Sequence, residues 1–110
     1  NWYVSQAREL TSANPELRFA VIGDDSDYRS EVAAAIPGAV EVKAGFETEF
    51  ALMTLCPAGL LSASTFAFWG AFFAHRALAS GHFIAPRFWA GHRTAEWYPT
   101  AIQAPFLTYA

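Results

Sequence analysis

The sequence predicts an α/β domain with a Rossmann-like parallel sheet and helices on both faces of the sheet. Short apolar runs alternate with segments of helical periodicity, and turns rich in Gly, Pro, Asp and Ser separate them. One long uncharged stretch, 50–74, is best explained as helix, buried strand and buried helix, because a strand covered on both faces is continuously apolar. Strands that alternate with helices at this spacing are typical of a parallel sheet.

The first half of the chain contains two predicted helix–strand pairs. Apolar residues at helical spacing end at Asn14-Pro15, and a short apolar run then ends at Gly23. A second helical pattern ends at Pro37-Gly38. We therefore expect helices over 2–13 and 28–36, and strands over 18–22 and 39–42.

The second half continues the alternation. We expect a deeply buried helix over 46–56, a strand over 60–62, a helix from about 64 to Gly81, a strand over 82–85 and an irregular aromatic segment over 86–110. Phe66, Trp69 and Phe73 share one stripe of the second helix. Because this segment is so apolar, we expect that stripe to belong to the core.

Composition limits the function classes. The 110 residues are 54% hydrophobic and 15% charged, which indicates one compact domain, 1–110, and excludes a disordered tail. The net charge of −3 provides no basic stripe for a phosphate backbone, so nucleic acid is not an expected partner. Cys56 is the single cysteine and is expected to be a small core hydrophobe.

The chain begins at Asn1 and its one methionine is Met53, so we expect it to be a fragment of a longer enzyme. No signal-peptide pattern opens it. The 50–74 stretch is long enough to cross a bilayer as a helix, but Pro57 and Gly59 interrupt it, which argues against a span. A membrane-embedded hairpin built from this stretch is an alternative to the buried elements.

Polar residues follow three of the predicted strands. Asp24 and Asp25 follow the first, Ser64 and Thr65 the third, and Arg87 the fourth. Ligands bind outside the carboxyl ends of parallel strands, so we expect these turns to open on one edge of the sheet. Ser64 and Thr65 at a helix start are compatible with phosphate binding and equally with an ordinary N-cap.

The acidic turn has three interpretations. Ser26 or Asp27 alone caps the following helix; a carboxylate accepts a hydrogen bond from a base or ribose; or Asp25-Ser26-Asp27 is the metal-binding pair of a metal-dependent glycosyltransferase. His75, His82 and His92 lack metal-ligand spacing, and no serine elbow is present, so a nucleophilic hydrolase is unsupported and no catalytic base is visible.

Four ordered motifs resemble the alpha-1,2-fucosyltransferases (glycosyltransferase family 11). The family pattern acid-x-x-Leu-Met-Ser-x-Cys is similar to EFALMTLC, and Ile-Ile-Ser-Asn-Ser-Thr-Phe-Ser-Trp-Trp-Ala-Ala is similar to LLSASTFAFWGA. The family's strand ending in Ser-Asp-Asp and its Ile-Ala-Pro-Lys-x-Trp are similar to FAVIGDD and FIAPRFW. These segments are 49–56, 60–71, 19–25 and 83–89, and together they extend over most of the chain.

The resemblance implies the C-terminal, donor-binding half of a GT-B enzyme. Such an enzyme transfers fucose from GDP-fucose to a galactoside acceptor with inversion and without a metal ion or other cofactor. The resemblance assigns guanine or ribose recognition to Asp25 with Asp24, and diphosphate binding to Ser64, Thr65 and the backbone of Phe66. Arg87, which occupies the position of the family's lysine, is a further donor-binding candidate.

Departures from the family pattern limit what the resemblance implies. Ala63 replaces the family's Asn, which removes a polar group near the phosphate and puts donor affinity and choice in doubt.

The remaining partners implied by the resemblance are a glycan acceptor, the missing N-terminal domain and a membrane surface for peripheral association. The composition suits a bacterial cytoplasmic or peripheral membrane enzyme, whereas an animal relative would face the Golgi lumen. A receiver-like module is a non-enzymatic alternative, but it would lack its central phospho-acceptor Asp.

The family's His-x-Arg-Arg-x-Asp motif, whose arginine contributes to leaving-group stabilisation, is absent from these residues. We therefore predict that the 110 residues alone have little or no fucosyl-transfer activity. A turnover assay with GDP-fucose and a galactoside checks this, and rates like those of an intact enzyme would contradict it.

Overall fold

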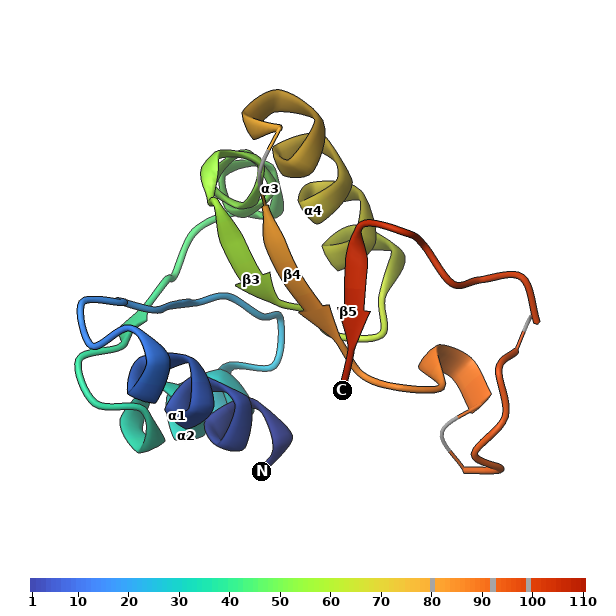
Figure 1. Ribbon diagram of the computed structural model, residues 1–110. Coiled ribbons are helices and arrows are strands. Elements are labelled where there is room, and N and C mark those ends of the chain that lie inside the picture. Colours follow the sequence, from blue (N-terminus) through green and yellow to red (C-terminus); the bar gives the residue numbers. More distant parts are fainter. Residues whose placement is uncertain (80, 92, 99) are drawn as a thin grey trace. The chain divides into compact units, whose positions relative to one another are not determined.

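The computed structural model describes residues 1–79, 81–91, 93–98 and 100–110 (Figure 1). Helices alternate with short parallel strands, as the sequence predicted. The chain divides into two compact units, Asn1–Glu49 and Phe50–Ala110, and each is described by itself. The bounds in chain order are α1 (Trp2–Ala13), β1 (Ala20–Val21), α2 (Ser26–Ala35), β2 (Val40–Glu41), α3 (Phe46–Leu55), β3 (Ala58–Leu60), α4 (Thr65–Leu78), β4 (His82–Ala85), the 3-10 helix η1 (Trp89–Gly91) and β5 (Leu107–Tyr109).

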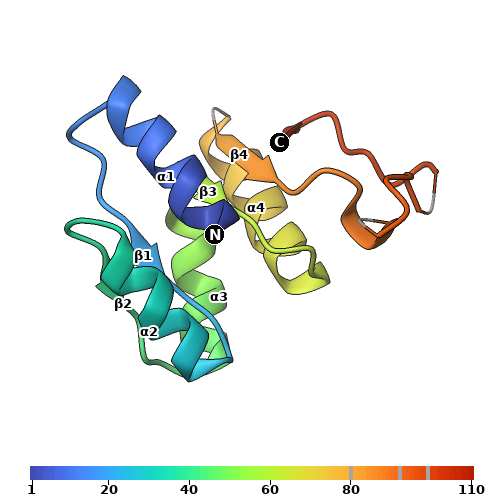
Figure 2. The ribbon, with the colours of Figure 1, turned by 90° about the horizontal axis from the view of Figure 1, so that it is seen from below.

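The first unit contains two helices and a two-stranded parallel sheet, visible in Figure 2. β1 pairs with β2 so that Ala20 lies opposite Val40. The side chain of Asn1 caps α1, and α1 ends at Ala13 because the next residue, Asn14, precedes Pro15 and has an extended backbone. α1 and α2 contact each other, and the buried hydrophobic residues of this unit are Val4, Ala7, Val32 and Ile36.

The second unit contains a three-stranded parallel sheet in the order β3-β4-β5, with β4 in the centre. Its core forms where α4 packs on the sheet. α4 contributes only small buried residues to this contact, namely Ala67, Ala71 and Ala74, and the sheet contributes Phe83 and Leu107. Because these helix side chains are small, a large part of the buried volume in this cluster comes from the aromatic ring of Phe83.

The strands pair in two sheets instead of the single sheet that the sequence predicted. β2 explains part of the difference. A central parallel strand needs apolar residues on both faces, but β2 has only two residues, one of them the charged Glu41, and its Val40 is exposed. β5 was not predicted, because its three residues lie within a segment rich in proline and aromatic residues. The strand predicted at 60–62 ends at Leu60, since the chain turns at Ser62 to begin α4.

Burial of the helices also differs from the prediction. Phe46 and Leu55 of α3 are 71% and 74% exposed, so α3 is not the deeply buried helix that the sequence predicted. The stripe of Phe66, Trp69 and Phe73 on α4 is exposed and not core. The reason is that the face with small residues fits the sheet more closely than the aromatic face does. Helix coverage of both sheet faces and the GT-B architecture stay predictions.

Cys56, in the second unit, is partly buried. Its thiol is directed to the Leu52 carbonyl at 3.3 Å, and burial raises the pKa of that thiol.

Within the described residues, no helix combines the length and the apolar character that a bilayer crossing requires.

Gly70 lies where α4 approaches α3, and the contact predicts the effect of adding a methyl group there. A Cβ at Gly70 would lie 2.7 Å from Cε and 3.0 Å from Cβ of Met53. The Gly70→Ala substitution gains about 1 kcal/mol in helix propensity but introduces overpacking that costs about 1–3 kcal/mol. We predict a net loss of stability, measured by urea unfolding.

Met53→Ala provides the matched control for this prediction. Met53→Ala removes the 2.7 Å contact with Cε and leaves the 3.0 Å contact with Cβ, so Gly70→Ala should cost less stability in the Met53→Ala background than in the unsubstituted chain. An equal loss of stability in both backgrounds would show that the Met53 contact is not the cause.

Candidate functional site

The carboxyl edge of the β3-β4-β5 sheet gathers four of the residues that the sequence singled out. β3 and β4 are parallel neighbours, so the residues that follow them emerge at the same edge. Ser64, Thr65 and Phe66 follow β3, and Arg87 follows β4. The Leu61 N–H donates to the Ile84 carbonyl at 2.8 Å, which continues the strand pairing up to the beginning of this turn.

Ser64 is the N-cap of α4. Its backbone is extended, with φ −136°, and its Oγ accepts a hydrogen bond from the Ala67 N–H at 3.1 Å. Ser62, which the sequence did not single out as a site residue, donates its hydroxyl to Ser64 Oγ at 3.2 Å. The capping interpretation is therefore confirmed, and Ser62 holds the capping hydroxyl in place.

Capping leaves other donors free at the same helix end. Among the described residues, the N–H groups of Thr65 and Phe66 have no hydrogen-bond partner, as is usual for the first turn of a helix. They lie at the positive end of a 14-residue helix. Unsatisfied donors and the helix dipole together favour an anion at this position.

Arg87 supplies a positive charge to the same edge. Its N–H donates to the Ala110 carbonyl at 2.9 Å, which ties the turn after β4 to the end of β5, and its side chain is exposed. Phe88 follows with φ 61°, a left-handed conformation that redirects the chain. The ring of Trp89 then meets the ring of Phe68 on α4, with centroids 6.2 Å apart, so the segment after β4 lies beside the N-terminal half of α4.

The acidic turn belongs to the first unit and follows β1. Asp25 is the N-cap of α2, because its Oδ1 accepts from the Tyr28 N–H at 3.0 Å. Asp24 Oδ1 accepts from the Asp25 N–H at 3.0 Å. The expectation that Ser26 or Asp27 provides the cap is wrong, since α2 already begins at Ser26. Both Asp24 and Asp25 stay exposed, so each can still accept a bond from a ligand.

A charged network that the sequence reasoning missed holds this turn against β2. Arg29 Nε donates to Glu41 Oε1 at 2.9 Å, and its guanidinium also donates to the Gly23 carbonyl. Ser30 donates to Glu41 Oε1 at 2.8 Å, and Lys43 Nζ lies 3.3 Å from Glu41 Oε2. The sequence does contain one signal for this network, an arginine one helical turn after the acidic turn. The partner of that arginine, Glu41, lies on a non-adjacent segment, and no local pattern predicted it.

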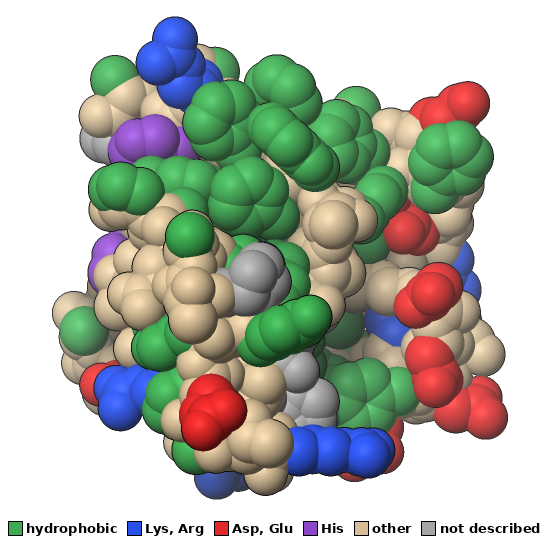
Figure 3. Space-filling view, turned by 90° about the vertical axis from the view of Figure 1, so that its right-hand side faces the viewer, with side chains coloured by type: hydrophobic (Ala, Val, Ile, Leu, Met, Phe, Trp, Pro, Cys, Tyr) green, Lys and Arg blue, Asp and Glu red, His purple; other side chains and the backbone are tan. Residues whose placement is uncertain are grey.

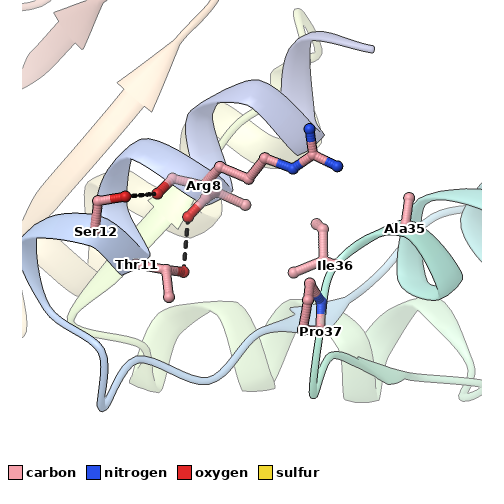
Figure 4. Close-up of a pocket in the computed structure, with 7 residues that line it drawn as sticks. Arg8, Thr11, Ser12, Ala35, Ile36 and Pro37 are labelled. Atoms are coloured by element: carbon pink, nitrogen blue, oxygen red, sulfur yellow. Dashed lines mark hydrogen bonds between the residues drawn. The ribbon is translucent and has the colours of Figure 1, made fainter.

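A hollow of about 450 Å3 lies elsewhere in the first unit, between α1 and the C-terminal end of α2 (Figure 4). The Thr11 and Ser12 hydroxyls at its wall donate to the carbonyls of Ala7 and Arg8, at 2.8 and 2.9 Å. Arg8 is the only charged side chain in its lining. None of the residues singled out from the sequence lines it, so we place the candidate site at the strand ends. The full lining is Ala7, Arg8, Thr11, Ser12, Ala35, Ile36 and Pro37.

The histidines and acids do not form a metal centre among the described residues: no group of three or more His, Cys, Asp or Glu side chains is arranged to hold a metal ion there. His75 stacks on Phe106 with centroids 5.3 Å apart, and His82 is exposed. His92 lies outside the described residues.

The sequence-predicted residues thus fall into two sets. Ser64, Thr65, Phe66 and Arg87 share one edge of one sheet, whereas Asp24 and Asp25 follow a strand of the other sheet, in the other compact unit. The expectation that all these turns open on one edge of one sheet is corrected accordingly. Comparisons with family models, with curated proteins and with solved structures find no match for this chain.

The Glu41 network predicts a pH dependence of stability. The hydrogen bond from Ser30, and after it that from Arg29, lowers the pKa of Glu41 from its ordinary value of 4.5. A lowered pKa in the folded state stabilises the fold above pH 4.5, and this contribution is lost as the pH falls through the folded pKa. We predict that the thermal midpoint falls below pH 4.5, and that Glu41→Gln weakens this dependence.

Thermal unfolding followed by circular dichroism over this pH range measures the effect. Glu9→Gln is the control, because it removes a carboxylate outside the network and should leave the pH dependence unchanged. Parallel pH profiles for Glu41→Gln and the unsubstituted chain would contradict the assigned role of Glu41.

Proposed function

We propose that this chain is the GDP-fucose-binding part of an enzyme similar to the alpha-1,2-fucosyltransferases, an inverting transferase of GT-B architecture. The observation that carries the proposal is the start of α4. There, the Ser-Thr-Phe sequence of the resembled motif coincides with a capped helix N-terminus that follows a parallel strand and has two free N–H groups.

The diphosphate would bind at that helix start. The N–H groups of Thr65 and Phe66 and the Thr65 hydroxyl supply donors, and the helix dipole favours the negative charge. Arg87, at the same sheet edge, supplies a full positive charge that the helix terminus lacks. Ser64 is committed to capping, so its contribution is to fix the directions of these donors.

In the proposed reaction, an acceptor hydroxyl oxygen of the galactoside forms a bond to C1 of fucose while the bond from C1 to the diphosphate oxygen breaks. GDP leaves with the bonding electron pair, and the acceptor proton passes to a base that these residues do not identify. Fixed donors at the leaving oxygen stabilise the charge that develops there, and this is the contribution we assign to the α4 terminus.

The proposal gives nucleoside recognition to the acidic turn. Asp25 uses one carboxylate oxygen as the N-cap of α2, and the second oxygen is an acceptor for a guanine N–H or a ribose hydroxyl. The Arg29 network holds the turn in place without occupying that second oxygen. A glycan acceptor and an N-terminal domain complete the proposed enzyme.

Calorimetric titration of the longest expressible chain that contains these residues tests the proposal. We expect binding of GDP in preference to UDP and ADP, with and without manganese. Ser64→Asp keeps a capping oxygen but places a negative charge beside the diphosphate, so GDP affinity should fall about tenfold or more while stability is kept. Asp25→Asn likewise keeps the cap of α2 and should reduce the preference for GDP.

Two further variants complete the design. Thr48→Asp introduces the same charge in the first unit, outside both turns, and should leave GDP affinity unchanged. Ala63→Asn restores the amide of the resembled motif and should strengthen GDP binding. A folded chain that binds none of the nucleotides would refute the proposal, and binding that requires manganese would favour the metal-dependent alternative at Asp25 and Asp27.

A further inference from the structure

Arg29 of α2 links the acidic turn after β1 to the strand β2. Its Nε donates to Glu41 Oε1 at 2.9 Å, and its guanidinium also donates to the Gly23 carbonyl, directly before Asp24. The Arg29 side chain is 11% exposed and the Glu41 side chain 20%. Because salt and water screen a partly buried pair much less than a surface pair, this contact acts on the turn at full strength.

The turn depends on this contact because the sheet ends before it. The pairing of β1 with β2 continues as far as the bond from the Val42 N–H to the Val21 carbonyl, at 2.9 Å. The helix α2 begins only at Ser26. Residues 22–24 lie between these two elements. Among the described residues, the Arg29 bond to Gly23 is the one that joins this stretch to α2 and, through Glu41, to β2.

Charge repulsion makes the position of the turn sensitive to the same contact. Asp24, Asp25 and Asp27 lie within four residues, and nine of the ten acidic residues lie in Asn1–Glu49. In Figure 3, acidic side chains gather along the right-hand side of the face shown. Neighbouring like charges favour any conformation that moves them apart. The Arg29 guanidinium opposes this, since it brings a positive charge to the backbone of the turn.

We propose that Arg29 is a positioning residue for nucleoside recognition at the acidic turn. The inference rests on the proposed function, in which Asp25 with Asp24 accepts hydrogen bonds from guanine or ribose. Among the described residues, the guanidinium donates to Glu41 and Gly23 and to neither aspartate, so both carboxylates keep acceptors for the ligand. Arg29 acts through the turn, because a turn that is fixed before binding loses less conformational entropy when the ligand binds.

The geometry requires an arginine at this position. One planar group donates to two different segments, and the Glu41 carboxylate that orients it is itself held by the Ser30 hydroxyl at 2.8 Å. A lysine could pair with Glu41, but its single nitrogen on a flexible stem cannot hold the carboxylate and the Gly23 carbonyl in the same geometry. We therefore expect Arg29→Lys to keep the fold and to release the turn.

Calorimetric titration of the longest expressible chain with GDP and with inorganic pyrophosphate tests the proposal. Pyrophosphate represents the part of GDP that we assign to the α4 terminus, and it lacks the nucleoside. We expect Arg29→Lys to lower GDP affinity about tenfold and to leave pyrophosphate affinity unchanged. Without any ligand, the backbone amide order parameters of residues 23–25, measured by NMR relaxation, should fall in the same variant.

Arg18→Lys is the matched control, because Arg18 also donates to backbone carbonyls of the first unit, those of Pro15 and Leu17, outside the turn. It should change neither the affinities nor the order parameters of the turn. Urea unfolding verifies that each variant folds. Glu41→Gln keeps an acceptor for Arg29 but removes the charge, so it should lower GDP affinity less, and it decides the question if Arg29→Lys does not fold.

The outcomes separate this inference from the proposed function. GDP affinity that both network variants leave unchanged would overturn the positioning role while the proposed function stands. Equal losses of GDP and pyrophosphate affinity would also overturn it, since they would report a general effect on the fold. An unsubstituted chain that binds pyrophosphate but not GDP would refute the nucleoside assignment itself, and this inference with it.

Discussion

The packing of α4 against the three-stranded sheet is the constraint on which the second unit depends. Ala67, Ala71 and Ala74 are buried there, and the ring of Phe83 fills the contact from the sheet. The fully buried residues of the helix are small, and three of its bulky aromatic residues, Phe66, Trp69 and Phe73, are exposed, whereas Phe68 packs against the edge of the core. The Ser64 cap fixes where α4 begins, and so where the free N–H groups of its first turn lie.

The two candidate turns use the same local device. A side-chain oxygen, from Ser64 in one unit and from Asp25 in the other, accepts from the N–H three residues later and begins a helix directly after a parallel strand. Each cap is supported by a neighbour, Ser62 in one turn and the Arg29 network near the other. Capping and ligand binding are compatible here, because capping satisfies one donor and leaves others of the first turn free.

Periodicity and turn chemistry predicted most of the helices and strands but few of the contacts between them. The helix over 2–13 and the strand over 82–85 have the bounds that periodicity and the flanking Pro and Gly predicted. β5 was missed because three residues within a proline-rich segment carry no periodic signal. The N-cap at Ser64 was predictable from a hydroxyl before an apolar helix, whereas the partnership of Arg29 with Glu41 joins non-adjacent segments and left no local pattern.

The sequence by itself determined the order of helices and strands and the positions of polar turns after strands, because these follow from local periodicity and turn chemistry. The tertiary structure decided which strands pair, which side of α4 is buried and which turns share an edge. An apolar segment specifies that it should be buried but not against what, and for α4 close packing selected the alanine side over the aromatic side.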